Sequence, residues 1–201
     1  MAFNRGLGSI LSLALCLIAV NAEASTDRVF LIGDSEAYLL NVPLAKLAKR
    51  DNVPFGAAPV PGSSVISWAI ANQAGWQALS RFQPTVVLVS LGANDSCMST
   101  RIVNNEPPYL ARFLRNLASK KVIWIGPPVI GAKEGCGLKD CLSRAIPGLE
   151  AFATMVKNQQ VPYWDARELI LPMWDDFLHP TTVGQQTWAT WIWARLRVLL
   201  V

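Results

Sequence analysis

The chain has one histidine among its 201 residues, His179. Near neutral pH, imidazole is the only side chain whose unperturbed pKa lets it exchange a proton readily, so a reaction that needs such a base must use His179. With one histidine and four cysteines, the sequence has few of the ligands that structural zinc sites require. We therefore do not expect a bound metal.

Charged side chains are also scarce, at 16% of the residues, whereas hydrophobic residues make up 52%. This composition is typical of a folded chain with a substantial core and argues against disorder. The net charge is only +4, and the basic residues form scattered pairs such as Lys120 with Lys121. Because no continuous basic stripe is present, we do not expect a nucleic-acid partner.

Long apolar runs are absent except near the N-terminus, where residues 10–20 follow the positive charge of Arg5. This run is short for a membrane span, and small residues at Ala22 and Ala24 are typical of a signal-peptide cleavage site. The pattern predicts a signal peptide over residues 1–24 and one domain over residues 25–201. An uncleaved anchor is the alternative. We expect an exported monomer, periplasmic or secreted, without stable membrane insertion after cleavage.

Three cysteines follow the predicted cleavage site, and an oxidising compartment favours a disulfide between two of them. Cys136 and Cys141 are close in sequence and can close a short loop. Cys97 is the alternative partner for either one.

Apolar runs with strand character alternate with helical patterns along the chain. Strands are expected at residues 28–32, 55–60, 85–91, 122–125 and 161–164, and helices at 37–50, 64–81, 109–119, 143–159 and 181–200. Such alternation predicts a parallel sheet with helices on both faces. Sites in such sheets lie beyond the carboxyl ends of the strands.

Polar motifs follow these predicted strands. Ser35 ends a Gly-Asp-Ser motif, where it is either a helix N-cap or an exposed hydroxyl. Asn94, in Gly-Ala-Asn-Asp, is either a turn residue or a donor to a negatively charged oxygen. Gly62 precedes a helical pattern and has a backbone N–H to offer. Asp176 precedes His179 by three residues, close enough to orient its ring.

These four motifs, in this order, resemble the four blocks of the SGNH hydrolases, also called GDSL-type esterases and lipases. The resemblance implies a three-layer α/β/α sandwich with a mostly parallel, flavodoxin-like sheet of about five strands. It also implies that Ser35 is the nucleophile, that His179 is the base and that Asp176 orients it. The oxyanion hole would combine the N–H groups of Ser35 and Gly62 with the Asn94 amide.

Some assignments within this resemblance have alternatives. Gly56 competes with Gly62 for the second block, and Asp175 competes with Asp176. Glu36 stands directly after the serine, where the family more often has an apolar residue. The Gly-x-Ser-x-Gly motif of the α/β-hydrolases is absent, which excludes that nucleophile elbow.

The resemblance implies an exported serine ester hydrolase that acts on small or medium acyl esters without a cofactor. A carbohydrate O-acetylesterase or O-acyltransferase using the same site is the alternative, and a catalytically inactive carbohydrate-binding module is a less favoured one. Of the eight tryptophans, Trp174 lies next to the predicted histidine loop. It either lines the substrate pocket or packs in the core.

Overall fold

The computed structural model describes residues 26–97, 106–128 and 139–200, with side chains in the last range described from residue 147 onward. The predicted signal peptide over residues 1–24 and Cys136 lie outside the described residues, as does the side chain of Cys141. The export signal and the cysteine pairing therefore stay predictions. In the described part of the chain, no helix is both long enough and apolar enough to span a membrane.

A five-stranded sheet in which all paired strands are parallel forms the middle layer, in the order β2-β1-β3-β4-β5. This is the strand order of flavodoxin-like folds, as expected from the resemblance. Every residue of the central strands β1 and β3 is buried, which explains their continuous apolar sequences. The strands are β1 (Val29–Gly33), β2 (Phe55–Pro59), β3 (Val86–Ser90), β4 (Lys121–Ile125) and β5 (Tyr163–Trp164).

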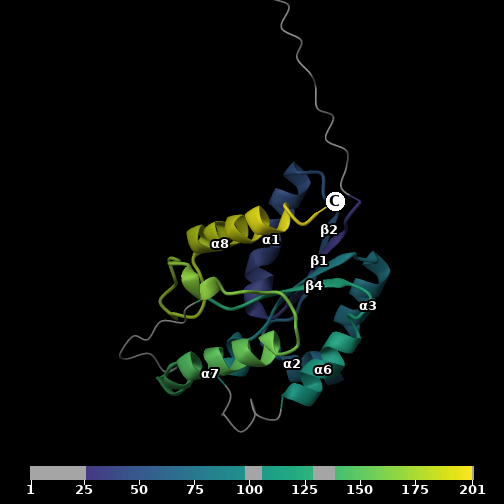
Figure 1. Cartoon of the computed structure of the whole chain (residues 1–201). Coiled ribbons are helices and arrows are strands. Elements are labelled where there is room, and N and C mark those ends of the chain that lie inside the picture. Colours follow the sequence, from purple (N-terminus) through teal and green to yellow (C-terminus); the bar gives the residue numbers. More distant parts are fainter. Residues whose placement is uncertain (1–25, 98–105, 129–138, 201) are drawn as a thin grey trace, which may run out of the picture.

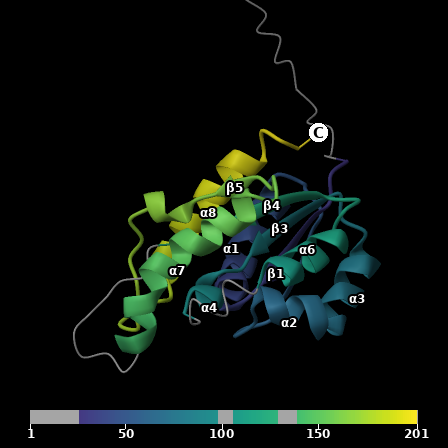
Figure 2. The same cartoon turned by 60° about the horizontal axis from the view of Figure 1, so that its bottom comes forward.

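Helices cover both faces of the sheet (Figures 1 and 2). One face packs against α1 (Ser35–Arg50) and α8 (Thr182–Leu196). The other face packs against α2 (Val65–Ile70), α3 (Gln73–Phe82), α6 (Pro107–Arg115) and α7 (Lys139–Lys157). A single-turn helix, α4 (Ala93–Ser96), follows β3, and the 3-10 helix η1 (Ala166–Glu168) follows β5. The predicted three-layer sandwich is confirmed.

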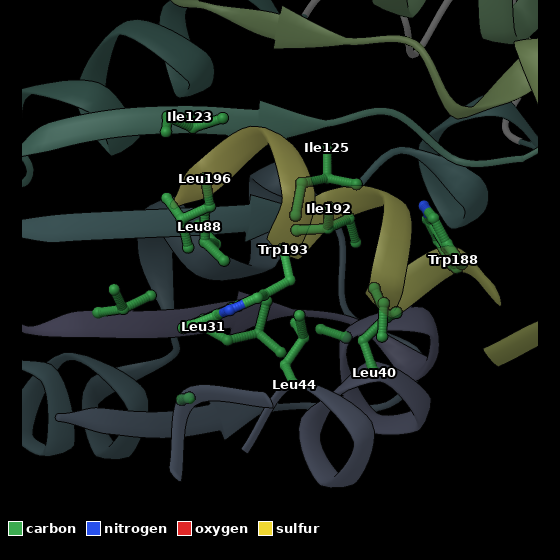
Figure 3. Packing of buried hydrophobic residues seen from close by; sticks show 14 of the residues in the cluster. Leu31, Leu40, Leu44, Leu88, Ile123, Ile125, Trp188, Ile192, Trp193 and Leu196 are labelled. Carbon is green, nitrogen blue, oxygen red and sulfur yellow. The ribbon is translucent and has the colours of Figure 1, made fainter. Parts of the chain in front are cut away.

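The core under α1 and α8 is made by aliphatic and indole side chains. Leu40 and Leu44 of α1 and Trp193 of α8 pack onto Leu31 of β1 and Leu88 of β3 (Figure 3). All five are almost completely buried. Burial of one such large side chain contributes roughly 1.5–3 kcal/mol. This core holds the N-terminus of α1 and the chain segment before α8 at the same end of the sheet.

The expected single helix over residues 64–81 is wrong, because the segment forms two helices, α2 and α3, separated at Ala71 and Asn72. The reason is a tertiary contact. A Cβ atom at Gly75 of α3 would overlap the Trp68 ring of α2, so the two helices approach as closely as a glycine allows. Trp68 and Trp76 then meet edge to face, with ring centroids 5.3 Å apart.

The three tryptophans of α8 lie in different environments. Trp188 and Trp193 are buried in the core. Trp191 is half-buried, and the guanidinium of Arg195 lies 3.9 Å from its ring centroid.

Candidate active site

Ser35 lies at the turn between β1 and α1, at the carboxyl end of a strand that has a neighbour on each side. Asp34 is the N-cap of α1, since its Oδ1 accepts a hydrogen bond from the backbone N–H of Glu36 at 2.9 Å. Asp34 rather than Ser35 therefore caps the helix. Ser35 is the first helical residue and is half-buried. Its N–H belongs to the first turn, where backbone donors have no partner within the helix.

The chain can make this turn because Gly33 approaches β3 very closely. Gly33 has a φ of +152°, and a Cβ atom there would overlap the backbone carbonyl of Ser90. The N–H of Asp34 donates to the same carbonyl at 3.1 Å. The glycine of the Gly-Asp-Ser motif is thus required by the contact between β1 and β3.

His179 is held by a tight loop that precedes α8. Asp176 Oδ1 accepts hydrogen bonds from the backbone N–H groups of Leu178 at 3.0 Å and His179 at 2.9 Å. Phe177 between them has a φ of +56°, in the left-handed region. The base of the loop is closed by an antiparallel bridge between Met173 and Pro180.

The loop brings three side chains into a hydrogen-bonded chain. His179 Nδ1 lies 2.7 Å from Asp176 Oδ2, and His179 Nε2 lies 3.0 Å from Ser35 Oγ. A carboxylate can only accept, so Nδ1 carries the proton and Nε2 presents a lone pair to the serine hydroxyl. Asp175, the competing acid, is exposed, while Asp176 occupies the position next to the ring.

The pKa of Asp176 reflects these contacts. Burial alone would raise it, but hydrogen bonds from the backbone and ring of His179 and from the Leu178 N–H outweigh burial and lower the pKa of this carboxyl. Asp176 is therefore ionised at neutral pH and can stabilise a positive charge on the imidazole.

Asn94 lies on α4, beside the serine turn. Its Nδ2 donates to the carbonyl of Ser63 at 2.9 Å and makes a longer 3.4 Å contact with Asp34 Oδ2. The carbonyl of Ser63 belongs to the residue directly after Gly62. The second and third sequence blocks therefore meet at the end of the sheet.

The structure places the two competing glycines differently. Gly62 has a φ of +77°, and a Cβ atom built on it would have no neighbour within 4 Å. Its surroundings are open, as a substrate site requires. Gly56 lies inside β2, where the rings of Phe30 and Phe82 would be only 2.8 and 2.9 Å from a Cβ atom. Gly62 thus has room beside it for a ligand, whereas Gly56 has none.

Two polar residues to which the sequence analysis assigned no role in the site, Ser63 and Asp95, support this arrangement. Ser63 donates through its hydroxyl to the carbonyl of Gly33 at 3.2 Å and accepts from Trp68 Nε1 at 2.9 Å. Asp95 Oδ1 accepts a hydrogen bond from the N–H of Val65, 30 residues earlier, at 2.9 Å. Sequence patterns carry no signal for such a distant contact.

Two buried acids lie directly behind the nucleophile. Burial raises the pKa of Asp34 to about 7, although the Glu36 N–H hydrogen bond acts in the opposite direction. Glu36 is fully buried, and neither carboxyl oxygen has a hydrogen-bond partner. Burial, together with the nearby Asp34 carboxyl, raises the pKa of Glu36 well above its ordinary value. Burial therefore favours the neutral, protonated form of Glu36.

Replacing Glu36 by leucine is expected to stabilise the fold by about 1–2 kcal/mol at pH 7, because an unpartnered buried carboxyl is removed. Because the pKa of Glu36 is higher in the folded state than in the unfolded state, the free energy of unfolding of the wild type falls as the pH rises above 4.5 toward the folded-state pKa. The gain from leucine should therefore increase from pH 5 to pH 9. Urea unfolding of the variant and of the exposed control Glu150→Leu measures it. A Glu36→Leu protein less stable than the wild type would contradict this account.

Trp174 remains a candidate substrate contact. Its side chain is 45% exposed, which excludes full core packing. Its backbone N–H donates to the carbonyl of His179 at 2.9 Å, so it belongs to the same loop. Within the described ranges, no group of three or more histidine, cysteine, aspartate or glutamate side chains is arranged to hold a metal ion.

Comparison with known proteins agrees with this geometry. The model of the GDSL-like lipase/acylhydrolase family matches residues 29–192. No curated protein sequence matches the chain significantly.

Similar solved structures include the acetyl xylan esterase AlAXEase, with 15% identity and a TM-score of 0.65 over 84% of this chain and 99% of that one. The lipase/acylhydrolase from Enterococcus faecalis has 20% identity and a TM-score of 0.61 over 87% and 97%. The M. smegmatis aryl esterase has 15% identity and a TM-score of 0.65 over 87% and 100%. At these identities the structures show a shared fold, and the family assignment comes from the sequence match. The chain therefore belongs to the GDSL-like lipase/acylhydrolase family, the SGNH-type serine esterases.

Proposed function

We propose that this protein hydrolyses small or medium acyl esters through an acyl-enzyme on Ser35. The observation that carries the proposal is the hydrogen-bonded chain from Ser35 Oγ through His179 to Asp176. His179 Nε2 takes the hydroxyl proton as Ser35 Oγ attacks the ester carbonyl, and the imidazolium then protonates the departing alcohol. A water molecule then attacks the acyl-enzyme, with the same proton transfers through His179, and this step releases the acid and restores Ser35.

The oxyanion formed in each step would bind to three donors: the N–H groups of Ser35 and Gly62 and the side-chain amide of Asn94. Two features support this assignment. Gly62 is open on the side where a Cβ atom would project. Asn94 uses one amide hydrogen on Ser63, whereas its second makes only the 3.4 Å contact with Asp34. That second hydrogen is only weakly bonded and is the one that can donate to a substrate oxygen.

Replacing Asn94 by alanine should lower kcat by about a hundred- to a thousandfold, with little change in KM, because the lost donor acts on the transition state. Hydrolysis of p-nitrophenyl acetate by purified protein measures both constants. Asn116→Ala, at an exposed position after α6, is the matched control. If the two variants fold equally well and have equal kcat, Asn94 is not an oxyanion donor.

A fluorophosphonate probe tests the proposed nucleophile. It should label folded wild-type protein at Ser35 and leave Ser35→Ala unlabelled. Absence of labelling in folded wild-type protein would refute the hydrolase and favour the third reading of the sequence, an inactive carbohydrate-binding module.

For the substrate, we propose a short acyl group, with a carbohydrate acetyl ester as the second candidate. The exposed Trp174 on the histidine loop favours a sugar, because an aromatic face can pack against a sugar ring. Two structurally similar proteins are an acetyl xylan esterase and a carbohydrate acetylesterase from Sinorhizobium meliloti.

Rates on p-nitrophenyl esters of increasing chain length and on acetylated xylan separate the candidates. Turnover of long chains alone would contradict the short-acyl proposal. Transfer to an added sugar hydroxyl would identify an O-acyltransferase.

We also propose that the protein is exported to the periplasm or beyond. The support is the N-terminal sequence: a positive charge, an apolar run over residues 10–20, and small residues before the predicted cleavage after Ala24. Sequencing the N-terminus of the exported protein tests this, with Ser25 as the expected first residue.

A further inference from the structure

Two buried carboxyl groups lie beside the proposed oxyanion hole and have no part in the mechanism above. Asp95 directly follows Asn94 on α4, and Glu106 is the N-cap residue of α6. Both side chains are fully buried. Asp95 Oδ1 accepts from Val65 N–H, the first residue of α2, so Asp95 joins α4 to α2.

The Asp95 and Glu106 carboxyls interact with each other. The carboxyl groups of Asp95 and Glu106 are hydrogen-bonded to one another. Asp95 Oδ2 and both Glu106 carboxyl oxygens are buried and accept no hydrogen bond from an N–H or hydroxyl group of the described residues. Two carboxylates can only accept, so a hydrogen bond between them requires a shared proton. Burial raises the pKa of Asp95. Burial, and then the charge of Asp95, raises the pKa of Glu106 to about 9.

The pair is mechanically linked to the proposed oxyanion donors. Asn94 donates to the Ser63 carbonyl, and its neighbour Asp95 accepts from Val65, two residues further along the other segment. These two hydrogen bonds clamp α4 to the loop that carries Gly62. Glu106 reaches the clamp from α6, which packs against α2.

We propose that Glu106 is a positioning residue for the oxyanion hole: its shared proton holds the Asp95 carboxyl against the Val65 N–H and so keeps Gly62 and Asn94 at a fixed spacing. The inference rests on the proposed function of the site. Below the pH at which the shared proton is lost, the hydrogen bonds from Asn94 to Ser63 and from Val65 to Asp95 are intact. Above that pH, the two negative charges of Asp95 and Glu106 repel each other inside the protein, and these hydrogen bonds weaken.

The other charged groups near the pair are few in the part of the chain that the structure describes. The Asp34 carboxyl, on the serine turn, interacts with the charge of Asp95. The sequence of α2 contains no charged residue. Arg112 and Arg115 of α6 are exposed. On α7, which packs against α4, the described charged side chains Glu150 and Lys157 are exposed as well. The neighbouring negative charge of Asp34 reinforces retention of the proton.

The test is the pH dependence of kcat between pH 7 and 10.5 in wild type, Glu106→Gln and Glu106→Leu. Wild-type kcat should fall about tenfold above pH 9 as the oxyanion donors separate. Glutamine donates to Asp95 at every pH, so Glu106→Gln should stay within about twofold of its neutral-pH kcat. Leucine removes the bond, and Glu106→Leu should be about tenfold slower throughout, without an alkaline decline and with nearly unchanged KM.

Controls separate this inference from the proposed function. Glu150→Gln changes an exposed glutamate and should reproduce the wild-type profile. Thermal unfolding shows whether each variant is folded. In the wild type, the ¹³C resonance of the Glu106 carboxyl should titrate at the pH where kcat falls, a measurement that needs no variant. An alkaline decline in Glu106→Gln equal to the wild-type decline, or a wild-type kcat in folded Glu106→Leu, would overturn the inference. If fluorophosphonate still labels Ser35 in that case, the proposed function stands.

Discussion

Ser35→Ala and His179→Ala should each lower kcat by similar factors, on the order of 10⁵–10⁶, when the protein hydrolyses p-nitrophenyl acetate. The factors are similar because the serine is a weak nucleophile without its base, and the base has nothing to activate without the serine. The 3.0 Å contact between Ser35 Oγ and His179 Nε2 is the reason to expect this behaviour. The double variant should be scarcely slower than either single one.

Two neighbouring acids provide a matched comparison for the same assay. Asp176→Asn should lower kcat by about 10⁴, because the amide no longer holds the imidazole in the required tautomer. Asp175→Asn changes an exposed carboxyl and should leave kcat within about twofold of the wild type. A folded His179→Ala protein with substantial residual activity would refute the assignment of the base. A large loss in Asp175→Asn alone would refute the choice of Asp176.

Gly33→Ala is expected to destabilise the fold by more than about 4 kcal/mol, enough to prevent accumulation of folded protein. The new Cβ atom would overlap the backbone carbonyl of Ser90 and lie 2.8 Å from the Cβ of Ala37. Neither neighbour is the flexible end of a long side chain, so β1 would have to separate from β3. The φ of +152° adds strain for any residue other than glycine.

Gly62→Ala is the control for this effect. It also has a positive φ, +77°, but meets no atom within 4 Å. Its cost should be limited to the left-handed backbone, about 1–2 kcal/mol. Circular dichroism and urea unfolding of both variants measure the difference. Equal stability of the two would show that the contact with Ser90 does not limit residue 33.

Much of the fold could be predicted because the sheet is buried on both faces. Continuous apolar runs locate β1, β3 and β4 to within a few residues. Weaker patterns at residues 55–60 and 161–164 indicate the partly buried strands β2 and β5. The alternation with helical patterns indicates parallel pairing. The break between α2 and α3 could not be predicted in this way. It depends on Gly75 meeting Trp68 across the two helices, and a periodic pattern of apolar residues does not record which side chain fills which gap.

For the candidate site, the sequence by itself determined which residue types are present and in what order: one histidine, a serine after the first strand, an asparagine after the third. The motif spacing favoured Gly62 over Gly56 and Asp176 over Asp175, but it could not exclude the competing residue of either pair. The tertiary structure distinguishes the two members of each pair by their surroundings. Only one glycine is open to a ligand, and only one carboxyl meets the imidazole.

The pairing of Asp95 with Glu106 likewise came from the tertiary structure alone. The sequence shows two acids eleven positions apart, with nothing to distinguish them from solvent-exposed carboxyls. Their shared proton depends on burial and on the interaction between Asp95 of α4 and Glu106, the N-cap of α6, which are properties of the packed chain. Local sequence determines where strands and helices form, because backbone preference and apolar periodicity are local. The tertiary structure alone decides which polar groups meet and which lose water, because those contacts join residues far apart in the chain.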